Sequence, residues 1–318
     1  MDSTIPTIEV RNLDSRDLDK ADRIVRVAFG TFLGLADPTK AFGDKDVLKS
    51  RLRHGDSTAI AAYIDGHLIG NNVVSRWGSF GFFGPLAVRP DFWDKGVAGK
   101  LMVPTIDLFS KWGTTHEGLF TFPNSPKHIG LYHKFGFHAR FLTPVMVKSV
   151  SVSKNGGMDK FYSELNEPER ASMLESCREI TNSLYPGLDL TNEITAAYDG
   201  KLGDTVLLTI GSELEGFAVC HHGPNTEGGS GNCYVKFGAV RKEESGSANF
   251  SSLLSAIENY AARKQISRIE AGVNLARNEA FEKMLNKGYR TEFIGVAMHR
   301  PNQPAFNERK VFAIDDWR

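Results

Sequence analysis

The sequence contains an internal repeat with a constant offset, and this repeat constrains the fold more than any other feature. Three short matches carry it, and each falls in the same kind of predicted element in both copies. The matched pairs, each 152 residues apart, are Ala87-Val88-Arg89 with Ala239-Val240-Arg241, Gly136-Phe137 with Gly288-Tyr289, and Leu101 with Leu253. Length alone, 318 residues, suggests about two domains. The repeat predicts more, namely two tandem copies of one fold.

Hydrophobic periodicity predicts that each copy is an α/β (α+β) unit, with a mixed central sheet flanked by helices. In the first copy we expect strands at 7–13, 58–64, 67–74, 82–88 and 118–122, and helices at 17–29, 46–53, 101–112 and 126–135. In the second copy we expect strands at 206–210, 214–220, 233–240 and 268–273, and helices at 168–185, 250–264 and 279–287. Residues 148–157 are rich in Ser, Lys and Gly and are typical of a linker. We therefore expect an N-terminal domain at 1–150 and a C-terminal domain at 158–318.

Charge and cysteine content exclude several classes of protein. Lys plus Arg and Asp plus Glu both total 38, so the formal net charge is zero and no global basic field attracts nucleic acid or an anionic membrane. The polar N-terminal segment predicts no signal peptide, and no apolar run is long enough to span a membrane. Cys177, Cys220 and Cys233 form no CxxC pair. They favour reduced thiols in a cytoplasmic protein over a disulfide framework or a metal site.

A turn rich in small residues lies between a predicted strand and a predicted helix, at Gly96, Ala98 and Gly99. Small residues let the backbone approach an anion closely, and a helix start offers unpaired N–H groups and a favourable dipole. The turn therefore fits a phosphate cradle, although tight packing alone also needs small residues. It is not a P-loop, because Asp94 and Leu101 stand where Gly and Ser or Thr are required, and it contains no GxGxxG fingerprint.

Two motifs in this region resemble signatures of the GNAT acetyltransferase superfamily. The sequence WDKGVA at 93–98 is similar to the acetyl-CoA-binding signature, which is Arg or Gln, two residues, Gly, any residue, then Gly or Ala. It departs at the first position, where Trp93 replaces Arg or Gln. Asn124 and the sequence LYHKFGF at 131–137 resemble the family's Asn and its helix ending in Leu-Tyr-x-Lys-x-Gly-Phe. The resemblance covers about residues 60–140 and implies two tandem GNAT folds.

The resemblance also implies how acetyl-CoA, as co-substrate without a metal, binds in the first copy. Backbone groups of β-strand residues would pair with the pantetheine arm, amides of the turn would hold the pyrophosphate, and Asn124 would contact the cofactor between two strands. The expected cofactor-binding residues are Leu86, Ala87, Val88, Asp94, Lys95, Gly96, Val97, Ala98, Gly99, Lys100 and Asn124. Tyr132 would act as general acid toward the departing thiolate, because a phenol is a neutral donor at working pH.

The general base is harder to identify. An amine acceptor is protonated near neutral pH and must lose a proton before it attacks a thioester. Many family members carry a Glu on the strand that corresponds to residues 76–88, but this stretch contains no carboxylate here. Glu117 is our candidate base. The alternatives are His116, His128, His133, a water chain, and a carboxylate of the C-terminal tail, namely Asp315, Asp316 or the terminus.

The second copy lacks the same chemistry. At the constant offset, Gly96, Ala98 and Gly99 become Ala248, Phe250 and Ser251, and the expected Tyr becomes Met284. We therefore expect one acetyl-CoA site, in the N-terminal copy, while the C-terminal copy is structural or shapes the acceptor pocket.

The expected activity is acetyl-CoA-dependent transfer of an acetyl group to a primary amine of a small molecule. The aromatic and apolar residues expected near the acceptor favour a small or partly apolar amine; they are Phe29, Phe32, Leu33, Leu35, Phe42, Phe80, Phe82 and Phe83. Two other interpretations stay open. One is a non-catalytic acyl-CoA-binding or regulatory GNAT-fold protein, and the other is an acyltransferase for a different acyl group or acceptor. The oligomeric state is open.

Overall fold

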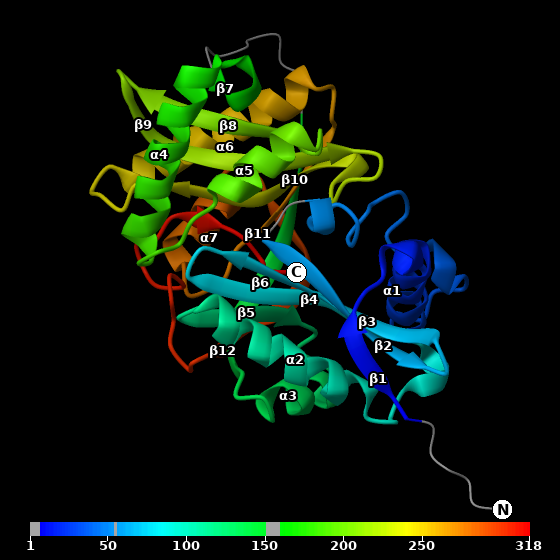
Figure 1. The fold of residues 1–318 in the computed structure, drawn as a ribbon. Helices are drawn as coiled ribbons and strands as arrows, with labels where there is room; N and C mark the ends of the chain where they lie inside the picture. Colours follow the sequence, from blue (N-terminus) through cyan, green and yellow to red (C-terminus); the bar gives the residue numbers. More distant parts are fainter. Residues whose placement is uncertain (1–6, 54–55, 151–159) are drawn as a thin grey trace, which may run out of the picture.

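The computed structural model describes residues 7–53, 56–150 and 160–318. The strands in these ranges form one 13-stranded mixed sheet, which is flanked by helices as the sequence predicts (Figure 1). The strands of the first half are β1 Glu9–Asn12, β2 Ser57–Ile64, β3 His67–Trp77, β4 Phe80–Val88, β5 His116–Thr121 and β6 His138–Ser149. Those of the second half are β7 Lys160–Phe161, β8 Gly203–Ile210, β9 Glu213–Gly223, β10 Gly229–Val240, β11 Arg268–Gly272, β12 Arg290–Arg300 and β13 Ala313–Ile314.

The helices repeat the same order in both halves. The first half contains α1 Leu18–Phe32, α2 Val97–Trp112 and α3 Pro126–His133, and the second contains α4 Glu167–Leu184, α5 Thr191–Asp199, α6 Gly246–Arg263 and α7 Asn278–Asn286. The series β2-β3-β4-α2-β5-α3-β6 thus recurs as β8-β9-β10-α6-β11-α7-β12. Even the register repeats, because Phe82 pairs with Gly118 in the first half and Tyr234 pairs with Glu270, each 152 residues later, in the second. The predicted repetition of one fold is confirmed.

The two halves exchange their last strands. β12 lies beside β5 of the first half, and β6 lies between β12 and β11, so the strand order is β1-β2-β3-β4-β5-β12-β6-β11-β10-β9-β8-β7. The predicted linker at 148–157 begins at the end of β6, and its residues 151–157 lie outside the described residues. The exchange joins two sheets into one continuous sheet. Strands of both halves therefore lie side by side in the middle of the sheet.

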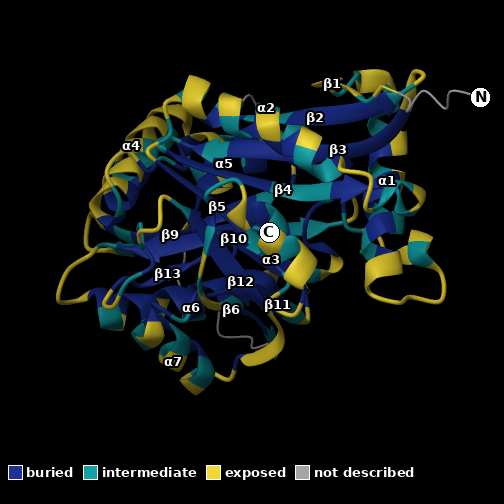
Figure 2. Cartoon of the chain, turned by 90° about the horizontal axis from the view of Figure 1, so that it is seen from below, coloured by how far each residue is buried: buried dark blue, intermediate teal, exposed yellow. Residues whose placement is uncertain are grey.

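Helices cover both faces of the sheet in the first half. Along β2, Ile60 and Ala62 face the cluster formed with α2, whereas Ala59 and Ala61 face the cluster formed with α1. This alternation is the two-residue period of a strand that is buried on both faces. Figure 2 shows the strands as the buried layer and the outward faces of the helices as the exposed one. No helix in the described ranges is long and apolar enough to cross a membrane.

One local prediction was wrong, and one helix was not predicted. Residues 46–53 form turns and a short 3-10 segment, Arg51–Arg53, instead of a helix. The Asp46 carboxylate accepts hydrogen bonds from the backbone N–H groups of Leu48 and Lys49, at 3.1 and 2.7 Å, and so fixes a tight turn. Helix α5 was not expected, because its short sequence has an apolar pattern too brief to distinguish from a loop.

Candidate active site

A cavity opens where β4 and β5 diverge. The two parallel strands pair only from Phe80 with His116 to Phe82 with Gly118. Beyond this point β4 contains an irregularity, because the three residue steps from Phe83 to Leu86 span the same length as the two steps from Val74 to Asn72 on β3. The strands then separate, and a cavity of about 1260 Å³ is lined by β4, the turn before α2, the end of β5 and α3.

The turn before α2 has the geometry of an anion cradle. Asp94 and Gly96 adopt positive φ angles of 63° and 77°, and Gly96 caps α2 without a side-chain hydrogen bond to the first turn. A Cβ atom added at Gly96 or Gly99 would meet nothing within 4 Å, so the space in front of this backbone is open. The first N–H groups of a helix have no intrahelical partner. The turn therefore fits the pyrophosphate of acetyl-CoA.

Most of the expected cofactor residues line this cavity: Leu86, Ala87, Val88, Asp94, Gly96, Val97, Ala98, Gly99 and Asn124. Lys95 and Lys100 are not among the lining residues. The Lys95 ammonium lies over the ring of Phe92, 5.0 Å from its centre, and the Lys100 N–H already donates to the carbonyl of Gly96. The geometry therefore does not support a cofactor contact for Lys95 or Lys100.

Trp93, which departs from the family signature, fastens the turn to the end of β4. Its indole Nε1 donates to the carbonyl oxygen of Val88 at 2.7 Å. The next residue, Asp94, forms an ion pair with Lys127 on α3, at 2.6 Å. Lys127 thus places a positive charge beside the only carboxylate on the cavity-lining part of the turn. Both contacts hold the turn between β4 and α3.

Tyr132 lies in the same cavity, on α3. Ser125 begins this helix, because its hydroxyl accepts from the N–H of His128, and Pro126 occupies the first turn. The Tyr132 ring packs against Phe83 in an edge-to-face contact, with 5.6 Å between ring centres. Burial raises the pKa of Tyr132, so its phenol is neutral at physiological pH. Tyr132 can therefore donate a proton.

The structure does not support Glu117 as the general base. Its carboxylate accepts from Arg300 Nε at 3.0 Å and from the Thr114 hydroxyl at 2.9 Å, and the residue is only 6% exposed. Glu117 is the second residue of β5, where β5 still pairs with β4, and it is not among the residues that line the cavity. An ion pair at the closed end of the two strands leaves it no path to a substrate.

Four other candidate bases also lie outside the cavity. His116 is buried against His299, with 2.9 Å between their ring nitrogens, and Asp315 forms a buried ion pair with Arg277. Asp316 accepts from the Tyr234 hydroxyl at 3.1 Å. These three residues and His133 are not among the lining residues.

Arg318, at the terminus, lines the cavity, and its main-chain oxygen accepts from Arg51 Nη2. His128 is the other of these candidates that lines the cavity. It lines the cavity one helical turn before Tyr132, and its ring lies 5.1 Å from that of Phe32. Burial, together with the charge of Lys127, lowers the pKa of His128. Its imidazole is therefore neutral at pH 7 and can accept a proton.

In the second half, the chain itself fills the corresponding groove. β13 pairs with β10 at Gly238 and Ala239, which correspond to Leu86 and Ala87 at the constant offset. Phe250 is fully buried inside α6, and Met284 is buried in the same core cluster. These contacts block the groove and fill the cradle, in agreement with the loss of chemistry that the sequence predicts.

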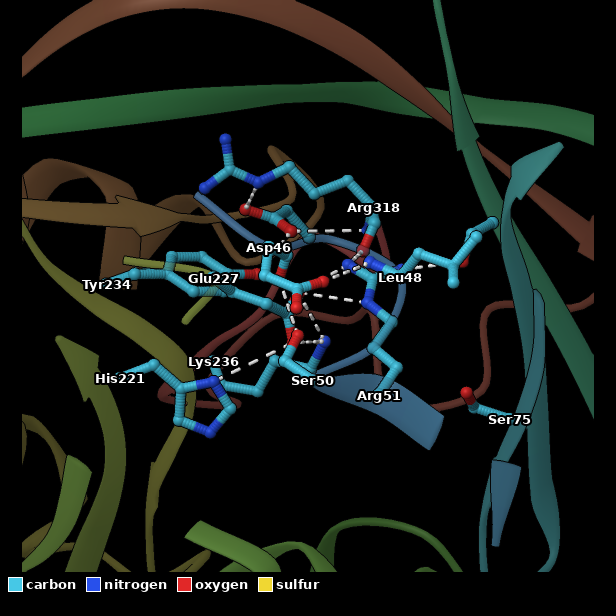
Figure 3. A network of polar contacts seen from close by, with 12 residues as sticks. Asp46, Leu48, Ser50, Arg51, Ser75, His221, Glu227, Tyr234, Lys236 and Arg318 are labelled. Atoms are coloured by element: carbon cyan, nitrogen blue, oxygen red, sulfur yellow. Dashed lines mark hydrogen bonds and ion pairs between the residues drawn. The ribbon is translucent and has the colours of Figure 1, made fainter. Parts of the chain in front are cut away.

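The far end of the cavity contains charged residues that the sequence analysis missed. Lys45, Arg51, Glu227, Tyr234, Glu270, Glu292 and Arg318 contribute to its lining. Figure 3 shows the network around Glu227, whose carboxylate contacts Arg51 and Lys236. A signal was present, because Lys236 and Glu270 lie on predicted buried strands, where charges require partners. Of the expected acceptor residues, Phe29, Phe32, Leu33, Phe42 and Phe83 line the cavity, whereas Leu35, Phe80 and Phe82 do not.

The described ranges contain no group of three or more His, Cys, Asp or Glu residues that could bind a metal ion. The described cysteines Cys177, Cys220 and Cys233 are free and buried.

Comparison with known proteins agrees with this geometry. Residues 27–137 match the model of the acetyltransferase (GNAT) family. No curated protein matches the sequence significantly. A putative acetyltransferase from Pyrococcus horikoshii is 13% identical with a TM-score of 0.66, and the match covers 98% of this chain and 95% of that one.

Two further solved structures are similar over almost the whole chain. A GCN5-related N-acetyltransferase from Sphaerobacter thermophilus is 12% identical, with a TM-score of 0.57 and coverage of 92% and 95%. A tandem GNAT protein from the clavulanic acid biosynthesis pathway is also 12% identical, with a TM-score of 0.57 and coverage of 92% and 98%. At this identity the structures show a shared fold. Residues 27–137 match the acetyltransferase (GNAT) family model, and almost the whole chain is similar in fold to a tandem GNAT protein.

Proposed function

We propose that this protein is an acetyl-CoA-dependent N-acetyltransferase that acts on a primary amine of a small molecule. One observation carries the proposal: the open backbone turn at 94–99, the unpaired edge of β4, Asn124 and Tyr132 all line a single cavity. A fold-only or binding-only protein has no need to place a neutral, buried phenol beside the open end of two strands.

The residues of the first half divide the task of binding. Backbone N–H groups of Val97, Ala98 and Gly99 hold the pyrophosphate, with support from the dipole of α2. The edge of β4 at Leu86 and Ala87 pairs with the pantetheine arm, and Asn124 contacts the arm from the end of β5. Acetyl-CoA supplies an activated thioester. The side chains around it then need only to move protons.

Two residues on one face of α3 would handle those protons. His128, neutral at pH 7, accepts a proton from the acceptor ammonium, and the amine nitrogen forms a bond to the acyl carbon as the carbon–sulfur bond breaks. Tyr132 donates its phenolic proton to the departing sulfur, and its phenolate takes up the second proton that the nitrogen loses as the amide forms. The products are the amide, the CoA thiol and protonated His128, which releases its proton to water. His128 thus takes the role that the sequence analysis gave to Glu117.

The free, buried cysteines support a reducing, cytoplasmic setting.

The Tyr132→Phe variant tests this function. The ring and its packing on Phe83 are kept, so we expect acetyl-CoA affinity by calorimetry to stay unchanged, while the rate of thiol release with an amine falls roughly 10- to 100-fold. Tyr185→Phe is the matched control, because its hydroxyl contacts Thr115 and does not line the cavity. No thiol release by the wild type with any amine tested would contradict the enzymatic function, and equal release by wild type and Tyr132→Phe would contradict the role of Tyr132 as general acid.

A further inference from the structure

Beyond the acetyl-CoA groove, the cavity ends at a wall built by both halves of the chain. Lys45 and Arg51 come from the segment 42–53 that follows α1, whereas Tyr234, Glu270 and Arg318 come from the second half. An acceptor would lie at this wall, because the other end of the cavity is lined by the turn and α3, where acetyl-CoA would bind. The chemistry of the wall therefore indicates which acceptor fits.

Backbone and side-chain bonds fix the segment 42–53 against the second half. The Asp46 N–H donates to the carbonyl of Thr226 at 2.9 Å, and the Asn225 N–H donates to the carbonyl of Asp44 at 3.0 Å. The Asp44 carboxylate also accepts from the backbone N–H of Ser230 at 3.0 Å. Lys45 lies within this anchored segment, so its ammonium is held at the wall.

Around Glu270, the two cations are more exposed than the carboxylate that they share. Arg318 also pairs with Asp316 at 3.1 Å, and Glu292, whose side chain is 43% exposed, lines the cavity as well. The Glu270 side chain is 4% exposed and contacts the Lys45 ammonium at 2.8 Å and the Arg318 guanidinium at 2.6 Å. The side chains of Lys45 and Arg318 are each 22% exposed. Burial alone would raise the pKa of Glu270, but these two cations hold it below its usual value, so the carboxylate stays charged. A molecule entering the cavity meets N–H donors before it meets this carboxylate.

Arg51 connects this wall to the reacting groups. Its Nη1 donates to the carbonyl of Gly84 at 2.6 Å, and its Nη2 donates to the main-chain oxygen of Arg318, the last residue of the sequence. Gly84 directly follows Phe83, the residue that packs on Tyr132. One guanidinium group therefore spans the distance from the active end of β4 to Arg318.

An apolar surface lines the cavity between α3, where Phe32 lies against His128, and the wall, where Phe293 lies against Arg318. The rings of Phe29 and Phe42 lie 5.3 Å apart, and those of Phe32 and Phe122 lie 4.9 Å apart. Phe293 on β12 is 37% exposed and also lines the cavity. Exposed aromatic side chains around a cavity are typical of a site for an apolar ligand group.

We propose that the acceptor is an amine that also carries a carboxylate and an apolar or aromatic group, as in an apolar α-amino acid. Lys45 and Arg318 bind the carboxylate, and the phenylalanine surface binds the side chain. An α-amino acid suits the short span set by Arg51, because its amine and carboxylate share one carbon atom. This inference rests on the proposed acetyltransferase function and names its substrate class.

The test compares acceptors that differ by one group: phenylalanine, phenylalaninamide, phenethylamine and, as a purely cationic probe, 1,4-diaminobutane. Thiol release from acetyl-CoA gives kcat/KM for each. We expect phenylalanine to exceed each of the others at least tenfold, since charge-assisted hydrogen bonds to the carboxylate are lost in all three. Equal or faster turnover of any of the other three would overturn the inference.

A pair of variants in one segment makes the test residue-specific. Lys45→Gln should raise KM for phenylalanine at least fivefold while it changes KM for phenethylamine and for acetyl-CoA less than twofold. Lys49→Gln is the control, because Lys49 pairs with Asp19 and does not line the cavity. An unchanged KM for phenylalanine in Lys45→Gln would overturn the inference.

The outcomes also separate this inference from the proposed function. Absence of acetyl-CoA binding by calorimetry, with no thiol release from any amine, contradicts the acetyltransferase itself. Bound acetyl-CoA with turnover of phenethylamine or the diamine but not of phenylalanine leaves the acetyltransferase intact and overturns the substrate class. Bound acetyl-CoA with no turnover of any of the four acceptors also overturns it.

Discussion

Ala313 pairs with Ala239 on the edge of β10, at the position that Ala87 occupies on the open edge of β4. Asp315 continues the contact, because its N–H donates to the carbonyl of Gly272 on β11 at 3.0 Å. The second half thus uses its own backbone to fill the groove that the first half leaves open. In both halves the two parallel strands diverge. In the second half β13 fills the groove between them, whereas in the first half the groove is open to a ligand.

This relationship predicts one acetyl-CoA per chain. Calorimetric titration of the full chain should give a stoichiometry of one, because β13 occupies the second groove and Phe250 is buried where the second cradle would be. Gly99→Leu should weaken that single binding event. A second binding event, in the wild type or in the variant, would contradict the prediction.

The open space at Gly99 predicts a specific loss of affinity. A Cβ at this position meets no protein atom within 4 Å and Gly99 lines the cavity, so a leucine side chain should displace the pyrophosphate and cost little stability. We expect Gly99→Leu to weaken acetyl-CoA binding at least tenfold and to change the free energy of unfolding by less than about 1 kcal/mol.

Gly231→Leu is the matched control for Gly99→Leu. A Cβ at Gly231 also meets nothing within 4 Å, but the residue does not line the cavity. The control should bind acetyl-CoA with the wild-type affinity. Equal effects of the two substitutions would show that the turn at Gly99 does not hold the ligand.

Local and periodic signals in the sequence were sufficient for the fold class. Two of these signals are local to one element, namely the small residues at 96–99 and the apolar spacing of each helix. The third is the constant offset between the two copies, as between Ala87 and Ala239. They predicted the repeated α/β order and the strand-to-helix turn, which the structure contains. The role of that turn in binding stays a prediction.

Interactions between distant segments could not be predicted in the same way. The exchange of β6 and β12 depends on pairing between residues such as Val147 and Arg290, far apart in sequence, and the strand pattern is the same with or without exchange. The turn at 46–53 depends on partners in the second half, and the ion pair of Arg51 with Glu227 spans 176 positions. Buried charges signalled that partners exist without revealing which ones.

The Glu227 network predicts an order of stability among variants. Glu227 contacts Arg51 at 2.5 Å and Lys236 at 2.8 Å, and all three side chains are 4% exposed. Glu227→Gln removes the carboxylate that both buried cations contact, so we expect a loss of roughly 3–5 kcal/mol in the free energy of unfolding. Arg51→Met leaves a balanced pair of Glu227 and Lys236 and should cost less.

Urea unfolding of these variants checks the order. The double variant Glu227→Gln with Arg51→Met removes one of these two cations, so it should recover part of the stability that Glu227→Gln loses. Glu164→Gln serves as a surface control, because its ion pair with Arg263 is 48% exposed on both sides and should matter by less than about 1 kcal/mol. A double variant less stable than Glu227→Gln alone would contradict the charge argument.

The buried pair of His116 and His299 predicts a loss of stability in mild acid. Burial lowers the pKa of His116 to about 4 and that of His299 to about 3, whereas both have values near 6.5 in an unfolded chain. Above pH 6.5 both histidines are neutral in the folded and the unfolded protein, so the pair does not make the free energy of unfolding depend on pH. As the pH falls from 6.5 toward 4, the unfolded chain binds protons that the folded protein does not. The free energy of unfolding should therefore fall by about 1.4 kcal/mol per pH unit for each histidine.

Urea unfolding between pH 7 and pH 5 measures this slope. Removal of both rings in His116→Asn with His299→Asn should reduce it without abolishing it, because burial also lowers the pKa values of His128, His221 and His222. The range above pH 5 lies above the unfolded values of the carboxyl groups, so Glu227 and Glu270 contribute little to the slope there. His67→Asn removes an exposed imidazole and should keep the wild-type slope. If the double variant keeps it as well, the two buried histidines do not control acid stability.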